Sequence, residues 1–136
     1  MVRRWPAELR SVLRGTCGAT AVEFAMIAPV MFGLLIGLFE TSRFFYVRSS
    51  LQKAVDDAGR YAMRTTTASD SAITEVAKRD LIEPVIAAAE FKIARATVSG
   101  TDFVTVSVDY TFTPLAAIVP LGTIPVSLQA RVPLVN

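Results

Sequence analysis

Histidine is absent from this sequence of 136 residues, and cysteine occurs only once, at position 17. An intramolecular disulfide is therefore impossible, and zinc sites of the Cys/His type and Ser-His or Cys-His catalytic pairs are excluded. The remaining candidates for acid–base or metal chemistry are the carboxylate pairs Asp56 and Asp57, and Asp102 and Asp109, which lack ligand spacing. We expect no enzyme activity, no metal site and no cofactor.

A large excess of positive charge is lacking as well, because the formal net charge is only +2. Four arginines against one glutamate precede Gly18, so this short leader carries +3 while the rest of the chain carries −1. The sequence pI of about 9.0 therefore reflects the leader rather than a basic face on a folded domain. Since nucleic-acid binding requires such a clustered basic face, we expect no nucleic-acid partner.

The longest feature that is present is an apolar run from Ala19 to Phe39, in which Glu23 is the only charge. As a helix it would be about 31 Å long, close to the thickness of the hydrocarbon layer of a bilayer. The run ends in Phe39-Glu40-Thr41, without the small-x-small site of a secretory signal peptide. A buried core helix would need more surrounding protein than this chain has. The run predicts a single membrane-spanning helix with its Arg-rich end in the cytoplasm and the C-terminal part exported.

Four positions inside the run have physical consequences. Pro29 removes one backbone donor, which membrane helices tolerate when neighbouring groups satisfy the freed carbonyl. Gly33 and Gly37 form a Gly-x-x-x-Gly pair that would let another helix approach closely, although glycine is also common in membrane helices without this role. A charge such as Glu23 is costly at membrane depth, so it marks a functional site by default.

The residues from Gly18 to Pro29 read Gly-Ala-Thr-Ala-Val-Glu-Phe-Ala-Met-Ile-Ala-Pro. This segment resembles the start of type IV pilin-like proteins, and in particular the TadE-like pseudopilins of the Flp (tight-adherence) branch. In that superfamily a prepilin peptidase cuts after a glycine that ends a basic leader, and Glu stands at the fifth mature position. The resemblance covers roughly residues 15–60 and places the cut between Gly18 and Ala19, with Glu23 fifth and the aromatic Phe24 next. Thr20 stands where another small residue is often found.

The resemblance implies a pilin-like fold and a role as a minor pseudopilin or assembly factor of a Flp/Tad-type pilus, in the bacterial inner membrane. The implied partners are a prepilin peptidase, other pilin or pseudopilin subunits, Tad inner-membrane assembly proteins and membrane lipid. Glu23 would pair with the freed amine of Ala19, from its own or a neighbouring subunit. The alternative is an uncleaved single-pass anchor that presents a small periplasmic domain to an export complex, with Glu23 reaching the headgroups.

Beyond the run, apolar residues continue at steps of three and four from Phe44 to Ala62. This period predicts that the helix extends from about Thr20 to Met63, with its apolar stripe packed on the chain's own domain or on neighbouring subunits. A second short helix would be capped by Ser69 or Asp70 and ended or kinked by Pro84, with a further helical turn or two over 85–91. Its predicted buried face comprises Ile73, Val76, Ala77, Leu81 and Ile82.

The tail changes to a period of two. Strong alternation predicts strands over 104–113 and 124–134, and a weaker strand over 92–98 is joined to the first by a turn at 99–102. The predicted class is α+β, with about three antiparallel strands. The expected segments are a leader (1–18), a transmembrane helix (19–39), its amphipathic continuation (40–67) and an exported domain (68–136).

Two features are left open by the sequence. The apolar connection Pro114 to Pro120 needs a burial site, which could lie under the sheet, toward the membrane or on a partner. Cys17 would be inert or lost with the leader, and the alternative is that it is acylated.

Overall fold

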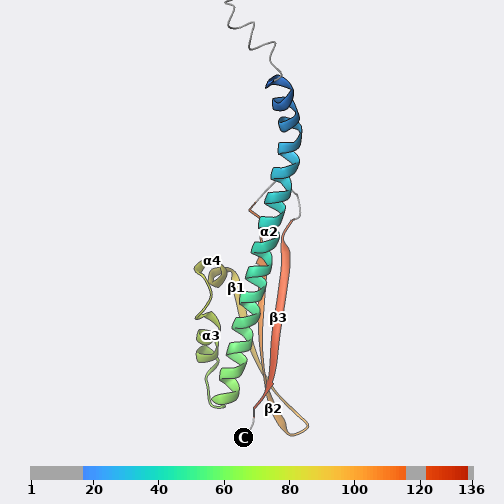
Figure 1. Cartoon of the computed structure of the whole chain (residues 1–136). Helices are drawn as coiled ribbons and strands as arrows, with labels where there is room; N and C mark the ends of the chain where they lie inside the picture. Colours follow the sequence, from blue (N-terminus) through green and yellow to red (C-terminus); the bar gives the residue numbers. More distant parts are fainter. Residues whose placement is uncertain (1–16, 116–121, 135–136) are drawn as a thin grey trace, which may run out of the picture. The chain divides into compact units, whose positions relative to one another are not determined.

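The structure, a computed structural model, describes residues 17–115 and 122–134 (Figure 1). Its elements in chain order are α2 (Cys17–Arg64), α3 (Asp70–Lys78), α4 (Glu83–Ala88), β1 (Ala89–Val98), β2 (Thr101–Phe112) and β3 (Ile124–Pro133). The predicted α+β class, with a long apolar N-terminal helix, short helices and a three-stranded antiparallel sheet, is confirmed. The chain divides into two compact units on either side of the Phe39–Glu40 bond, and each is described by itself.

Helix α2 is close to the predicted length and contains Pro29 without being interrupted there. Arg64 in its last turn places a positive charge near the negative end of the helix dipole, which favours termination at this point. The Thr65 amide still donates to the Tyr61 carbonyl at 3.0 Å, after which the β-branched residues Thr65 to Thr67 form a turn.

Helix α3 begins where a cap was predicted. The Ser69 hydroxyl accepts a hydrogen bond from the Ala72 amide at 3.3 Å, and Asp70 adds a negative charge to the first turn. Ile73 and Ala77 are buried on one face of the helix, as predicted. The helix ends at Lys78, so the buried Leu81 follows it in the connection to the next helix.

Two predictions in the next segment are wrong, and a third is right only in part. Pro84 does not end α3 but occupies the first turn of α4, where its missing N–H has no intrahelical acceptor to lose. Ile82 is the N-cap residue of α4 and is 50% exposed, because the chain leaves the buried face there. The further helical turn predicted over 85–91 is present as α4, but it ends at Ala88, and Phe91 already belongs to strand β1.

The sheet is a meander with the order β1-β2-β3, in which both neighbouring pairs are antiparallel. Val106 in the central strand faces Ile93 on one side and Ala130 on the other. The β1–β2 turn consists of Ser99 and Gly100 alone, with φ of 53° and 80°, so the predicted four-residue turn is shorter by two residues. Positive φ at both central positions gives the turn a twist that matches the right-handed twist of the two flanking strands.

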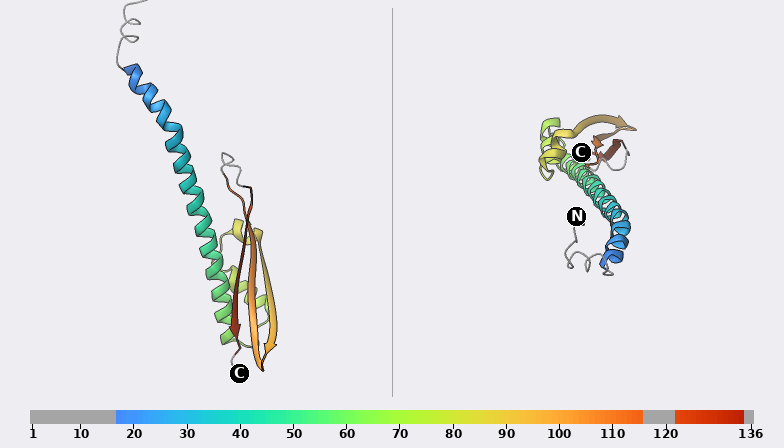
Figure 2. Two further views of the ribbon diagram at one scale, coloured as in Figure 1. Left: turned by 90° about the vertical axis from the view of Figure 1, so that its right-hand side faces the viewer. Right: turned by 90° about the horizontal axis from the view of Figure 1, so that it is seen from above.

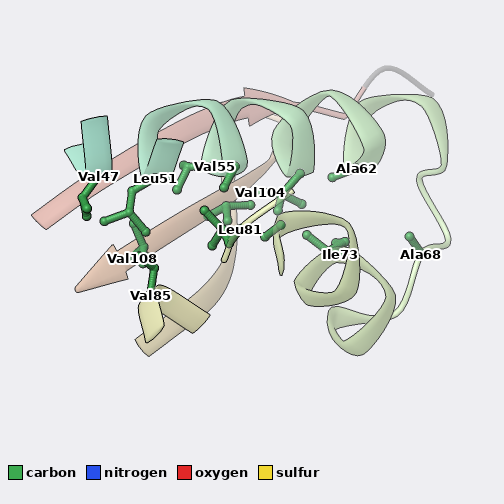
Figure 3. Close-up of a cluster of buried hydrophobic side chains, with 14 residues drawn as sticks. Val47, Leu51, Val55, Ala62, Ala68, Ile73, Leu81, Val85, Val104 and Val108 are labelled. Carbon is green, nitrogen blue, oxygen red and sulfur yellow. The ribbon is translucent and has the colours of Figure 1, made fainter. Parts of the chain in front are cut away.

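Within the unit that begins at Glu40, the second half of α2 packs against one face of the sheet together with α3 and α4 (Figures 2 and 3). Leu51 and Val55 of α2, and Val104 and Val108 of β2, are completely buried. The prediction that the apolar stripe packs on the chain's own domain is therefore confirmed. Figure 3 shows these side chains directed toward Ile73, Leu81 and Val85 from the shorter helices and their connection.

Helix α2 and strand β3 come very close at Gly59, which is buried. A Cβ atom at this position would lie 3.2 Å from Cγ1 of Val132 and 3.7 Å from Cβ of Ala130. Ordinary van der Waals contact begins at slightly longer distances, so the absence of a side chain at Gly59 permits the close approach of helix and strand.

Candidate functional site

The first turns of α2 contain the predicted processing residues. Gly18 and Ala19 are exposed, and a Cβ atom added to Gly18 would have no neighbouring atom within 4 Å. Residues 1–16 of the predicted leader lie outside the described residues. Because no described atom lies within 4 Å of a Cβ at Gly18, a larger residue there would leave the described fold undisturbed. Any effect of such a change on processing would then be a direct effect on the cleavage site.

Glu23 and Phe24 lie one turn further along the same helix, and both are exposed. Ala19 and Glu23 are four residues apart, so they occupy the same face of α2, about 6 Å apart along the helix axis. Within the part of the chain that the structure describes, Glu23 takes part in none of the salt bridges. A positive group placed over the first turn of α2 would meet this carboxylate.

The segment from Gly18 to Phe39 is apolar around its whole circumference. Large side chains on every side are exposed, including Phe24 at 63%, Met26 at 75% and Leu34 at 66%. The helix is long and apolar enough to cross a membrane, with a mean hydropathy of 2.1 and no residue of its most apolar window buried. An apolar helix without a packing partner in its own chain is consistent with a single-pass membrane anchor.

Pro29, Gly33 and Gly37 follow one another at intervals of four along α2. A Cβ atom at either glycine would meet nothing within 4 Å, so this side of the helix is open to another helix. Spacing of four residues places all three on one side of the helix. The structure thus brings together the three positions that the sequence indicated for helix packing.

A cluster that the sequence did not predict lies at the first turn of α2 after the apolar segment. The Arg43 guanidinium forms a salt bridge of 3.1 Å with the Glu40 carboxylate and donates to the Thr113 carbonyl at 2.6 Å. The other Glu40 oxygen accepts from the Leu115 amide at 3.1 Å. The Arg43 guanidinium also lies 4.5 Å from the centre of the Phe112 ring, a cation–π distance. These contacts fasten the end of β2 to α2.

The only sequence signal for this cluster is the spacing of Glu40 and Arg43 by three, which predicts a local ion pair on a helix. Their contacts to Thr113 and Leu115 join segments 70 and 75 residues apart in the chain, and no local pattern contains such a pairing. Of the apolar connection 114–120, only Pro114 and Leu115 belong to the described residues. Leu115 is 73% exposed, so it is not folded under the sheet.

The outer face of the sheet is polar and carries an ordered row of side chains across its three strands. Asp109 accepts from the Ser127 hydroxyl at 2.7 Å and from the Lys92 ammonium at 3.0 Å. The hydrogen bonds from Ser127 and then Lys92 lower the pKa of Asp109. The hydrogen bond to Asp109 and the nearby charge of Glu90 raise the pKa of Lys92. All of these groups are solvated, and the row aligns the strands.

Two of the other carboxylates considered for chemistry also have structural partners. Asp56 accepts from the Gln52 side chain at 3.1 Å, and Asp102 accepts from the Thr97 hydroxyl at 2.6 Å. Over residues 17–115 and 122–134, no group of three or more Asp, Glu, Cys or His side chains is placed to hold a metal ion.

Comparison with known proteins identifies one family. Residues 18–60 match the family described as TadE-like protein, which bears out the resemblance in this segment. The matched segment is about a third of the chain and begins at Gly18. No curated protein and no solved structure matches the chain.

Proposed function

We propose that this chain is a minor pseudopilin or assembly factor of a Flp/Tad-type pilus, anchored in the bacterial inner membrane by the apolar part of α2. The observation that supports this most directly is the TadE-like match over residues 18–60. That segment contains the exposed apolar helix and the single carboxylate inside it. The N-terminus would be cytoplasmic and the unit that begins at Glu40 would be exported, in accordance with the arginines before Gly18.

Processing is the second part of the proposal. A prepilin peptidase would hydrolyse the amide bond between Gly18 and Ala19, releasing the leader and leaving a free ammonium group on Ala19. Because Ala19 and Glu23 share one face of α2, this ammonium would neutralise the Glu23 carboxylate within one subunit or between two subunits. The pairing offsets the cost of holding a carboxylate at membrane depth.

The intact mass and N-terminal sequence of the protein purified from native membranes test the processing step. We expect Ala19 as the first residue, and we expect Gly18→Leu to retain the leader. Gly15→Leu, a glycine replacement three residues upstream, is the matched control and should be cleaved normally. Retention of residues 1–18 by the native protein in cells with an active peptidase would instead favour the uncleaved anchor that presents its domain to an export complex.

The proposed role of Glu23 has its own test. Glu23→Ala should insert into the membrane as well as the native protein does, because removing a charge lowers the cost of insertion. The same variant should reduce the number of pili seen by electron microscopy, while Thr20→Ala, on the same turn, should not. Normal piliation by Glu23→Ala would contradict the pairing.

The packing side of α2 is proposed to contact other pilin or pseudopilin subunits or the Tad inner-membrane assembly proteins. Support comes from the Gly-x-x-x-Gly spacing of Gly33 and Gly37, where an added Cβ atom would meet no described atom within 4 Å. Cysteine crosslinking from Gly37 in native membranes, with Leu35 on another side of the helix as control, would identify the neighbour. Equal crosslinking from both positions would argue against a defined packing side.

A further inference from the structure

Three large apolar side chains are exposed at or beside the first turns of α2 in the unit that begins at Glu40. Phe45 is 58% exposed, Tyr46 is 60% exposed and Leu115 is 73% exposed. Phe45 and Tyr46 are consecutive on α2, so they point about 100° apart around the helix axis. Leu115 is held at Glu40 by its backbone amide. Glu40 is five and six residues from the two aromatics, which places it on another side of the helix.

The contacts of Glu40 and Arg43 set the level of Leu115 along α2. Leu115 donates its backbone N–H to the Glu40 carboxylate at 3.1 Å, and Glu40 directly follows Phe39, the last residue of the apolar run. Thr113 is held by Arg43 at 2.6 Å, one turn further along. The end of β2 therefore lies at the level of Glu40 and Arg43 in α2. Phe45 and Tyr46 lie about 8 to 9 Å beyond Glu40 along the helix.

These distances correspond to the polar layer of a bilayer. The headgroup region adds about 5 to 8 Å to each side of the hydrocarbon layer, so Glu40 would lie at its inner boundary and the two aromatics at its outer edge. Aromatic side chains are enriched at this level because a ring can contact lipid while a hydroxyl such as that of Tyr46 contacts water. The Glu40 charge at the boundary is already paired with Arg43.

We propose that Phe45, Tyr46 and Leu115 form an interfacial ring that contacts the lipid headgroup layer, and that Glu40 and Arg43 hold Leu115 in it. The protein would then touch the bilayer through its folded domain as well as through its apolar helix. Lipid is the occupant favoured by the structure, because the three side chains lie on different sides of α2 within about 9 Å along its axis, whereas a docked protein would cover one side. The inference rests on the membrane-spanning part of the proposed function and not on cleavage or pilus assembly.

Fluorescence quenching in lipid nanodiscs tests the ring. The full chain carries Cys17→Ser and one new cysteine labelled with an environment-sensitive dye. The labelled positions are Leu115→Cys in the ring, Val98→Cys at the β1–β2 hairpin and Leu34→Cys in the apolar segment. Val98 is the matched control because it is also an exposed apolar residue at a strand end, with 47% of its surface accessible. The bilayer contains phosphatidylcholine and phosphatidylglycerol with a spin label on a fraction of the headgroups or acyl chains.

We expect headgroup spin labels to quench the dye at Leu115 at least threefold more than the dye at Val98. Acyl-chain labels should quench the dye at Leu34 most strongly. Equal quenching at Leu115 and Val98, with strong quenching at Leu34, would overturn the ring and leave the proposed anchor intact. Weak quenching at Leu34 would instead overturn the membrane span and with it the proposed function. A dye at Leu115 that is shielded from aqueous iodide but not quenched by lipid would mean that protein covers the site, which also overturns the ring.

The clamp has a separate test in the same nanodiscs. Glu40→Ala removes the acceptor of the Leu115 amide and the partner of Arg43, so quenching at Leu115 should fall by half or more while quenching at Leu34 stays unchanged. Glu75→Ala, an exposed glutamate of α3, is the control and should change neither value. Unaltered quenching at Leu115 in Glu40→Ala would overturn the clamp.

Discussion

Replacing Leu51 by alanine should strongly destabilise the unit that begins at Glu40. The Leu51 side chain is completely buried in the core between α2 and the sheet. The substitution removes three carbon atoms, worth about 2.4 kcal/mol of transfer free energy at 0.8 kcal/mol per buried methylene. The cavity left behind raises the expected loss to about 3 to 5 kcal/mol, as in other buried Leu→Ala changes. This is a large share of the roughly 5 to 15 kcal/mol that stabilises a typical domain.

Urea unfolding of the full-length protein in detergent micelles measures this loss. Tyr61 and Tyr110 pack against the core, so near-ultraviolet circular dichroism of tyrosine reports on the tertiary structure of this unit. With a slope of about 1.5 kcal/mol per molar urea, the midpoint should fall by about 2 to 3 M. The circular dichroism of the apolar helix in the micelle is recorded separately in the far ultraviolet.

Ser49→Ala is the control for this experiment, because Ser49 lies on the exposed side of the same helix. Its free energy of unfolding should stay within about 0.5 kcal/mol of the native value, as for ordinary surface changes. A loss below about 1 kcal/mol for Leu51→Ala would refute the packing of α2 on the sheet. An equal loss for both variants would indicate a general effect on the helix rather than on the core.

Other changes have equally defined outcomes in the same unfolding assay. Gly59→Leu should lower the free energy of unfolding by about 1 to 3 kcal/mol through overpacking against Val132. Adding Val132→Ala to this variant should restore part of the loss, and the absence of any restoration would argue against the contact. Ser69→Ala removes the cap of α3 and should cost about 0.5 to 2 kcal/mol, whereas a neutral effect would mean that the cap is dispensable. The folded pKa of Asp109 is lowered from 3.8, so its contribution to folding stability is present above that value and is lost as the pH falls through the folded pKa. Asp109→Asn should therefore flatten the acid side of the stability profile, and an unchanged slope would contradict the hydrogen-bonded row. The folded pKa of Lys92 is raised from 10.5, so its contribution to folding stability should be complete below that value and lost as the pH rises through the folded pKa. Lys92→Met should remove this loss of stability at alkaline pH, and an unchanged stability profile would refute the role of Lys92.

The repetitive elements could be predicted because their signal is local. The steps of three and four that include Val47, Leu51 and Val55 indicate a helix, and the alternation around Val106 indicates a strand, whatever else the chain contains. The strand 124–134 follows from the same period, and it pairs antiparallel with β2.

The short helices could not be delimited in the same way. Pro84 is compatible both with the end of one helix and with the first turn of the next, and its tertiary surroundings decide between them. The sequence predicts a helical turn up to Phe91 because the seven residues of the range 85–91 are too few to distinguish the two periods. The Glu40–Arg43 cluster was missed for a different reason, since its contacts to Thr113 and Leu115 depend on the folded arrangement of distant segments.

The order of the elements along the chain also has a consequence for folding. Leu51 and Val55 of α2 precede Val104 of β2, which lies in the same core, by about fifty residues. Forming this contact therefore closes a long loop, whose ordering has an entropic cost. Synthesis from the N-terminus therefore produces the helix before β2 is available to cover its apolar side. The meander β1-β2-β3 forms from neighbouring segments, with two residues between β1 and β2 and eleven between β2 and β3. The apolar stripe of α2 thus remains uncovered until the last third of the chain has emerged, and this interval is when the protein is most exposed to aggregation.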